Sequence, residues 1–184
     1  MFFVALFLTE RTKSMAKVAE VLKPRARDEK ISIGLEDKYR EQASKDLSKI
    51  LAATYALTIK TQVYHWNVVG PLFKPIHELT EEHYNTLFAA VDIIAERIRA
   101  LGHLAPVNLQ SSSNFAPKTG ETQHHAAIDM VKDLIADHEA AVRQMREVGE
   151  AADEAGDLVT SDMLTARLTF HEKALWMLRA IIAS

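Results

Sequence analysis

Apolar residues recur at steps of three and four positions after about residue 37, and no stretch longer than five residues alternates as a strand would. This spacing predicts four long helices, at about residues 37–65, 74–102 and 121–149 and from after Asp157 to the end. Lys74 and Pro75 suit a first helical turn, because a proline there loses no helical hydrogen bond. We predict an all-α domain over residues 37–184, preceded by a flexible basic tail over residues 1–36.

The lengths of the connections favour one arrangement of these helices. The first and second helices are joined by a short segment, as are the third and fourth, whereas about 18 residues join the second and third. Two hairpins with a long crossover between them are typical of a four-helix bundle of the ferritin-like type. We expect a short helix within the crossover.

The composition excludes several classes of protein. The 184 residues include no cysteine, which rules out disulfide scaffolds, thiolate nucleophiles and cysteine zinc fingers. Any bound metal must therefore be held by His, Asp and Glu. The opening eight apolar residues are far fewer than the roughly 20 that span a bilayer, and Thr9, Glu10 and Arg11 give no convincing signal cleavage site. We predict a cytoplasmic protein with no membrane partner.

Charge is distributed unevenly along the chain. The net charge is -3, yet residues 11–30 carry seven Lys or Arg against three acids, and residues 31–184 carry 15 basic and 21 acidic residues. A uniformly basic nucleic-acid binder is excluded, and what remains is a basic tail on an acidic body.

Four polar residues of the predicted second helix form one stripe. With His77 at zero and about 100° per residue, Glu81 lies at about 40°, Asp92 at about 60° and Glu96 at about 100°. The apolar stripe of this helix centres about 130° away. The polar stripe therefore faces away from the chain's own core.

The two pairs within this stripe are too far apart to bind one ion. About 15 residues separate their midpoints, which corresponds to about 22 Å along a helix. The positions are symmetric about a point between residues 86 and 87, so an antiparallel copy would set His77 opposite Glu96 and Glu81 opposite Asp92. Two equivalent sites would form at a homodimer interface, with Phe88 near the axis.

His65, at the end of the first helix, folds back towards this stripe through the tight connection. Imidazoles with two or three carboxylates suit iron with open positions for an oxidant. The alternative interpretation is a solvated polar helix face, because acid-rich faces are common. The other histidines are expected elsewhere: His83, His138 and His171 as hydrogen-bonded core residues, and His103, His124 and His125 at the surface.

The segment from Tyr64 to Gly102, YHWNVVGPLFKPIHELTEEHYNTLFAAVDIIAERIRALG, resembles the signature of the Dps family, the DNA-binding proteins from starved cells. The last helix, with DLVTSDMLTARLTFHEKALWMLRA, resembles the family's C-terminal block. The resemblance implies a hollow homo-dodecameric shell that oxidises Fe(II) with hydrogen peroxide, or with oxygen, and stores ferric mineral.

The resemblance also implies the ligands of the ferroxidase site. One subunit would supply His65, His77 and Glu81, and its two-fold partner would supply Asp92 and Glu96. Many family members have Asp where this chain has Glu81, so direct ligation by Glu81 stays open.

Three further residues correspond to family features. Asp157 and Asp162 look like acids lining an iron-entry pore at the three-fold axis, and as isolated residues they are an N-cap and a first-turn acid. Trp66 resembles the family's tryptophan beside the site, which either quenches radicals or packs. Ordinary ferritins instead hold their di-iron centre inside one bundle, with Glu-x-x-His on two helices. Here that pattern occurs only at Glu121 to His124, where a helix starts.

Two hypotheses of function follow. The first is a ferroxidase that stores iron, consumes peroxide and thereby protects DNA. The alternative is a structural protein that compacts the nucleoid with little redox activity. Its support is the basic tail, since twelve tails on one shell could bind DNA phosphates multivalently and without sequence preference.

Overall fold

The computed structural model describes residues 26–106 and 126–183. Most of the predicted tail, the short helix expected in the crossover, His124 and His125 lie outside the described residues, as does the expected start of the third helix. The described residues form four helices and no strand: α2 (Asp37–Asn67), α3 (Phe73–Ala100), α4 (Ala127–Glu154) and α5 (Leu158–Ile181). No helix in these two ranges is long and apolar enough to cross a membrane.

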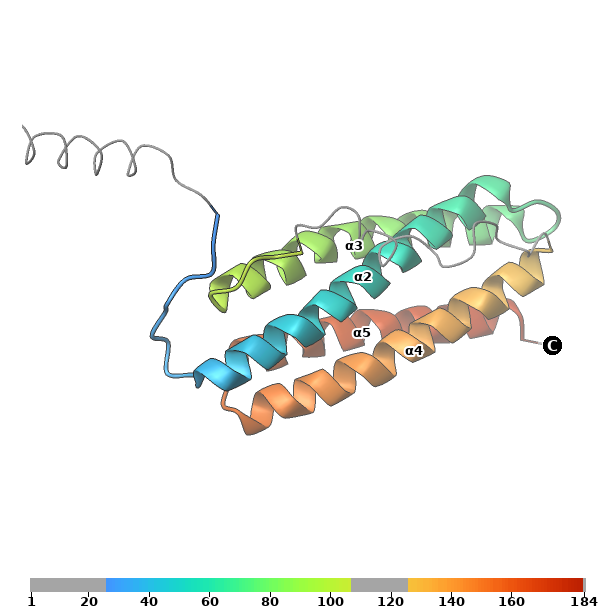
Figure 1. Cartoon of the computed structure of the whole chain (residues 1–184). Helices are drawn as coiled ribbons and strands as arrows, with labels where there is room; N and C mark the ends of the chain where they lie inside the picture. Colours follow the sequence, from blue (N-terminus) through green and yellow to red (C-terminus); the bar gives the residue numbers. More distant parts are fainter. Residues whose placement is uncertain (1–25, 107–125, 184) are drawn as a thin grey trace, which may run out of the picture.

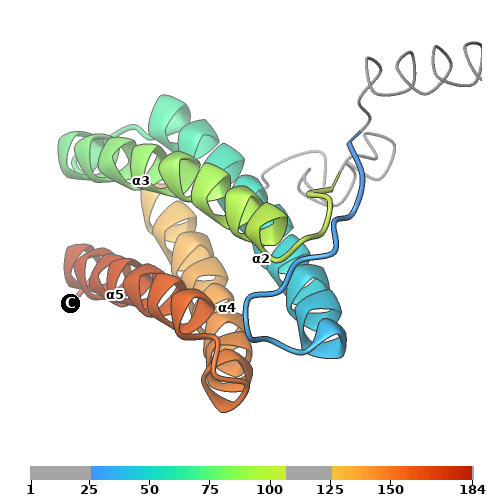
Figure 2. The ribbon, with the colours of Figure 1, turned by 90° about the vertical axis from the view of Figure 1, so that its left-hand side faces the viewer.

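The helices pair as two hairpins that pack against each other. Figures 1 and 2 show α2 beside α3 in one layer and α4 beside α5 in the other. One core cluster includes Leu47, Ile98 and Leu164, and a second, towards the other end of the bundle, includes Leu57 and Leu134. The prediction of a four-helix bundle is confirmed.

One predicted helix boundary was wrong. The third helix was expected to end near Gly149, but α4 continues to Glu154. Gly149 lies within the helix without a positive φ, and an added Cβ would meet the Leu164 Cβ at 3.8 Å, an ordinary contact. The helix ends instead just before Gly156, whose φ of 74° lies in the left-handed region that glycine adopts without strain.

The start of α5 is tied to the other hairpin by the carboxylate of Asp157. Asp157 caps α5, since its Oδ1 accepts the backbone N–H of Thr160 at 3.0 Å. The same carboxylate accepts hydrogen bonds from Arg97 of α3 at 2.7 Å and from the Tyr39 hydroxyl of α2 at 3.0 Å. Burial alone would raise the pKa of Asp157, but hydrogen bonds from Thr160 and Arg97 hold its pKa below the ordinary value.

The segment over residues 26–36 has no regular secondary structure, yet it is bonded to the end of α3. Glu29 N–H donates to the carbonyl of Gly102 at 2.7 Å, and Leu104 N–H donates to Asp28 at 2.8 Å. Arg99 adds an ion pair to Glu29 at 3.0 Å. Gly102 has φ of 90°, and an added Cβ would lie 2.7 Å from the Glu29 carbonyl oxygen. The described part of the predicted tail is therefore attached to the helical domain.

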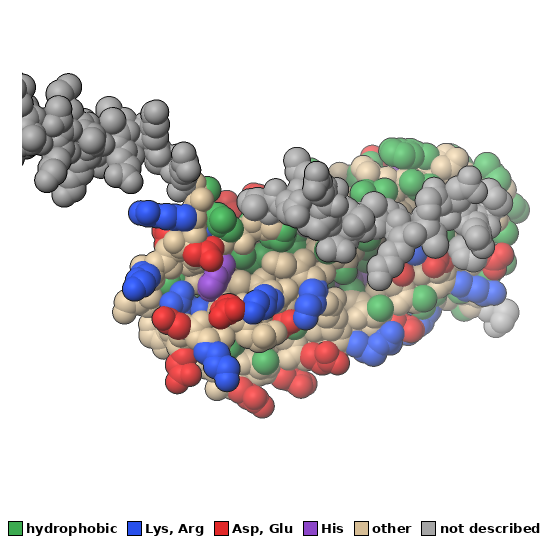
Figure 3. Space-filling model, in the orientation of Figure 1, with side chains coloured by type: hydrophobic (Ala, Val, Ile, Leu, Met, Phe, Trp, Pro, Cys, Tyr) green, Lys and Arg blue, Asp and Glu red, His purple; other side chains and the backbone are tan. Residues whose placement is uncertain are grey.

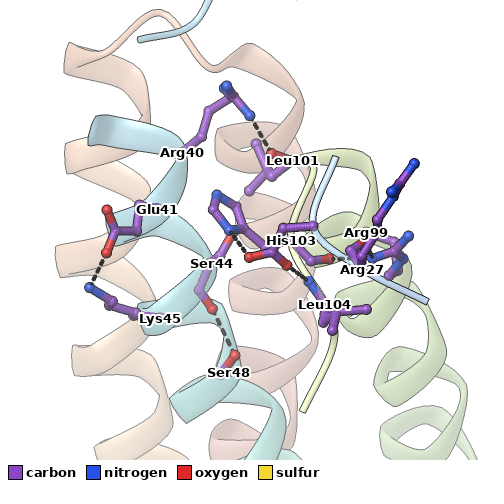
Figure 4. Close-up of polar contacts among 11 residues, drawn as sticks. Arg27, Arg40, Glu41, Ser44, Lys45, Ser48, Arg99, Leu101, His103 and Leu104 are labelled. Carbon is purple, nitrogen blue, oxygen red and sulfur yellow. Dashed lines mark hydrogen bonds and ion pairs between the residues drawn. The ribbon is translucent and has the colours of Figure 1, made fainter. Parts of the chain in front are cut away.

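Figure 4 shows the polar contacts around this attachment. Arg40 of α2 donates to the carbonyl of Leu101 at 2.8 Å, which holds the end of α3 against α2. His103, expected at the surface, is partly buried, with its Nδ1 3.6 Å from a carboxylate oxygen of Asp28.

Candidate metal site on the outer face of the second helix

His65 and His77 are joined by two reciprocal hydrogen bonds. The Nδ1 of each ring lies 2.9 Å from the backbone carbonyl oxygen of the other residue. The two rings are stacked, with centroids 3.8 Å apart and an interplanar angle of 15°. The two imidazoles, twelve residues apart in sequence, thus form one rigid unit.

The ends of the two helices explain this pairing. His65 lies in the last turn of α2, where backbone carbonyls have no helical partner, so its carbonyl can accept from His77. The turn between the helices is short, and Gly70 has φ of 91°, in the left-handed region. The carbonyl of His77 also accepts a bond from the Thr80 hydroxyl at 3.1 Å.

The reciprocal bonds fix the tautomer of both rings. A carbonyl oxygen can only accept, so Nδ1 of His65 and Nδ1 of His77 must each carry a proton. In the neutral ring the other nitrogen, Nε2, then keeps its lone pair. A backbone carbonyl bonded to Nδ1 is the arrangement by which proteins orient a histidine for metal binding through Nε2.

The three predicted carboxylate ligands are exposed on α3. Glu81, Asp92 and Glu96 all lie on the solvent side of the helix, as the stripe predicted. The structure therefore does not bring Asp92 and Glu96 to the two histidines within one chain. Among residues 26–106 and 126–183, no three His, Asp or Glu side chains are grouped so that they could hold a metal. The five-residue ligand set stays a prediction, and it requires a second chain.

Large apolar side chains surround these polar residues on the same outer surface. Trp66 is 66% exposed, Phe88 63% and Phe73 45%. Phe73 stacks on the His77 ring with centroids 4.9 Å apart. The sequence analysis missed Phe73, although it lies four residues before His77 and so on the same helix face. Exposed aromatic groups beside exposed carboxylates are typical of a surface that another chain covers.

The two acids predicted at the iron-entry pore differ in their surroundings. Asp157 is 2% exposed, and its oxygens accept four hydrogen bonds, so its N-cap role is confirmed. Asp162 is exposed near the start of α5. Within one chain, Asp162 is therefore the acid of the two that presents its carboxylate to solvent.

The histidines assigned to the core are buried, and they gather around an arginine that the sequence analysis did not single out. His83 of α3, His138 of α4 and His171 of α5 are at most 2% exposed. His138 and His171 share a hydrogen bond of 2.8 Å between their Nδ1 atoms. Arg167 is 8% exposed and lies over the Phe170 ring. The sequence did contain a signal for this burial, because the spacing of Arg167 from Leu164 and His171 places it on the buried face of α5.

Burial controls the protonation of this cluster. Burial lowers the pKa of His83 to about 4, of His138 to about 2 and of His171 to about 3. The positive charge of Arg167 lowers the pKa of His138 and His171 further. These histidines are neutral at physiological pH. The bundle interior holds no carboxylate cluster among the described residues, unlike a di-iron centre built inside one bundle.

The fold and the outer histidine pair define a ferritin-like protein whose candidate ligands lie outside its own bundle. The family model of the ferritin-like domain matches residues 44–184. A DNA protection during starvation protein of Brevibacillus brevis is 34% identical over 136 residues, covering 74% of this chain and 91% of that protein. The chain therefore belongs to the Dps family of ferritin-like proteins.

Two further comparisons give similar proteins over most of the chain. An uncharacterised low-temperature-induced protein of Nostoc sp. is 40% identical over 155 residues, covering 83% of this chain and 87% of that protein. The crystal structure of a Dps protein from Vibrio cholerae O1, described as a ferritin-like diiron-carboxylate protein, matches with a TM-score of 0.76. It is 27% identical and covers 87% of this chain and 100% of its own.

Proposed function

We propose that this protein is a ferroxidase that oxidises Fe(II) with hydrogen peroxide, or with oxygen, and stores ferric mineral within a shell of twelve chains. Membership of the Dps family supports the proposal. The observation that carries it is the locked pair of His65 and His77, whose Nε2 lone pairs are available to a metal. By storing iron and consuming peroxide, the protein would protect DNA in the cytoplasm.

Each site would form across a two-fold interface. His65, His77 and Glu81 of one chain would face Asp92 and Glu96 of an antiparallel α3 in its partner. The exposed Phe88 and Phe73 would exclude water between the chains, together with Trp66.

The carboxylates would attract Fe(II) and stabilise the higher charge of Fe(III), because hard oxygen ligands favour the more charged ion. One peroxide molecule would take up two protons and two electrons, one electron from each of two Fe(II) ions, and yield two waters. The Nδ1–H bonds to the two backbone carbonyls would orient both rings so that Nε2 faces the metal.

A mixing experiment tests the shared site. Asp92→Ala with Glu96→Ala, or His65→Ala with His77→Ala, should abolish fast Fe(II) oxidation measured by ultraviolet absorbance. Shells reassembled from both half-mutants would contain interfaces with one intact site and one doubly broken site, so activity should return.

A control variant and a direct check of mixing complete this experiment. Asp129→Ala with Glu147→Ala removes two exposed acids of α4 and should leave the rate unchanged. Size exclusion and mass spectrometry establish that the shells are mixed. Absence of activity in demonstrably mixed shells would contradict a site made from two chains.

Iron entry is proposed to depend on Asp162. Asp162→Asn should slow mineral growth more than the first oxidations in each shell, since it removes cation attraction and leaves the oxidation site intact. The effect should shrink as salt rises, because salt screens exposed charges.

The alternative function, DNA compaction with little redox activity, depends on the tail. Figure 3 shows acidic and basic side chains interspersed over the visible face of the helices, with no continuous basic surface there. In this alternative, DNA binding would depend on the seven positive charges of residues 11–30. Shells that retain DNA but oxidise no Fe(II) would favour this alternative.

A further inference from the structure

Five buried nitrogen atoms around His138 have no hydrogen-bond partner among residues 26–106 and 126–183. They are Nδ1 of His83, Nε2 of His138, Nε2 of His171, and Nε and Nη2 of Arg167. Buried polar atoms in native proteins almost always have a partner, and an unpaired buried charge is the most unfavourable case. The described residues therefore leave this cluster without the partner that it needs.

The missing group is expected to carry negative charge. Burial lowers the pKa of Arg167 to about 10, so its guanidinium is still protonated at neutral pH. Among the described residues, no acid raises the pKa of Arg167, which burial lowers. The face of Phe170, 4.8 Å from the guanidinium carbon, offsets only part of the desolvation. Water could satisfy the N–H groups but could not neutralise the charge.

A metal cation does not suit these atoms. The Nδ1 atoms of His138 and His171 are 2.8 Å apart, so one ring donates the shared proton and the other accepts it. The accepting neutral ring must then carry its own proton on Nε2. The pair thus offers one lone pair and one N–H group, and the positive Arg167 would repel a cation.

An anion beside Arg167 would select His171 as the ring that accepts, because the free Nε2 of that ring then carries a proton. His171 lies one helical turn after Arg167 on the same face of α5. With its Nδ1 accepting from His138, His171 presents an Nε2–H beside the guanidinium. Arg167 and His171 then form a set of N–H donors from two neighbouring turns.

We propose that Arg167 and His171 bind one small inorganic anion, of the size of a halide ion, inside each four-helix bundle. The donors are the Nε–H and Nη2–H of Arg167 and the Nε2–H of His171. The anion neutralises the guanidinium and gives a partner to three of the five unpaired nitrogens. Because it binds only the folded bundle, it stabilises that state in a concentration-dependent way.

Bromide is the probe for this site, since its anomalous scattering distinguishes it from water. The unfolding temperature of the full chain is measured with rising sodium bromide against sodium gluconate at equal ionic strength. We expect a saturable rise of a few degrees in bromide alone. Crystals grown in bromide should show an anomalous peak beside the guanidinium of Arg167.

Two substitutions separate this site from general salt effects. Arg167→Met keeps the length and packing of the side chain, and it should lose both the saturable rise and the peak. Arg143→Met removes an exposed arginine of α4 and should keep both.

An equal bromide response in the parent and in Arg167→Met would overturn the proposal. So would a crystal structure with water alone, or a carboxylate of another subunit, beside Arg167. If Arg167→Met fails to fold, the measurements on the parent protein are sufficient. The site is rejected if the parent shows no bromide-specific rise in unfolding temperature, or no anomalous peak beside Arg167.

Discussion

Asp157→Ala removes the carboxylate that holds the start of α5 against α2 and α3. Four donors lose their acceptor: the Nη2–H of Arg97, the Tyr39 hydroxyl, and the backbone N–H and hydroxyl of Thr160. The side chain of Arg97 is 10% exposed and that of Asp157 is 1% exposed, so a nearly buried guanidinium would lose its ion-pair partner.

The expected destabilisation follows from these contacts. Breaking a buried ion pair costs about 3–5 kcal/mol, and losing an N-cap costs about 1 kcal/mol. The hydrogen bonds of Thr160 contribute to both effects, so the two costs are not additive. We expect a total destabilisation of about 3–5 kcal/mol. Asp157→Asn keeps one oxygen for Arg97 and Thr160 N–H, and the two hydroxyls can rotate to accept from its amide. That variant should therefore cost only about 1–3 kcal/mol.

Urea unfolding followed by far-ultraviolet circular dichroism measures these differences. All variants are compared at one subunit concentration, because assembly contributes to apparent stability. Asp162→Ala, in an exposed position on the same helix, is the matched control and should stay within about 0.5 kcal/mol of the parent. A loss of less than about 1 kcal/mol in Asp157→Ala would refute this account of the buried pair.

Three further predictions concern pH, a glycine and the tail. The folded pKa values of His138 and His171 lie below the ordinary value, so unfolded chains bind more protons and stability falls as pH drops below about 6.5. Replacing His171 by Gln should flatten the dependence of unfolding free energy on pH by about 1.2 kcal/mol per pH unit between pH 6 and 5, and an unchanged slope would contradict its burial as a neutral ring. Gly102→Ala should speed tryptic cleavage after Arg27 more than Gly34→Ala does, because both have positive φ but only Gly102 has the Glu29 carbonyl 2.7 Å from an added Cβ. Deleting residues 1–26 removes five of the seven positive charges and keeps the bonded segment, so gel retention of DNA should be lost while Fe(II) oxidation is unchanged.

The helices could be predicted from the sequence because their apolar spacing is long and regular. The end of α4 could not be predicted, because a glycine such as Gly149 is typical of the residue that follows a helix. In the structure Gly149 does not adopt a positive φ, and α4 continues through it beside Leu164 of α5. Gly156, which has a positive φ, follows the end of α4. This glycine lets the chain turn into α5, which begins at Leu158.

The candidate site was only partly visible in the sequence. Helical spacing predicted that the carboxylates of Glu81, Asp92 and Glu96 would lie outside the core, and the structure confirms this exposure. The reciprocal bonds of His65 and His77 could not be predicted, because they depend on the register between two helices set by the turn. The buried Arg167 was also not predicted. A pattern of apolar residues defines the buried face of a helix, but it does not show which polar side chains are buried on that face.

The two groups of histidines in this chain indicate why the proposed iron chemistry lies outside the bundle. In the interior, neutral rings lie near the positive Arg167, and the described residues form no metal-binding group there, so cations are disfavoured. Outside the core, His65 of α2 and His77 of α3 are paired, and the carboxylates of α3 are open to water in a single chain. Under the proposed function, the site becomes dry and complete only when a second copy covers Phe88 and supplies the remaining acids. Oxidation should therefore begin only in assembled protein, so free subunits would not generate Fe(III) outside a shell able to store it.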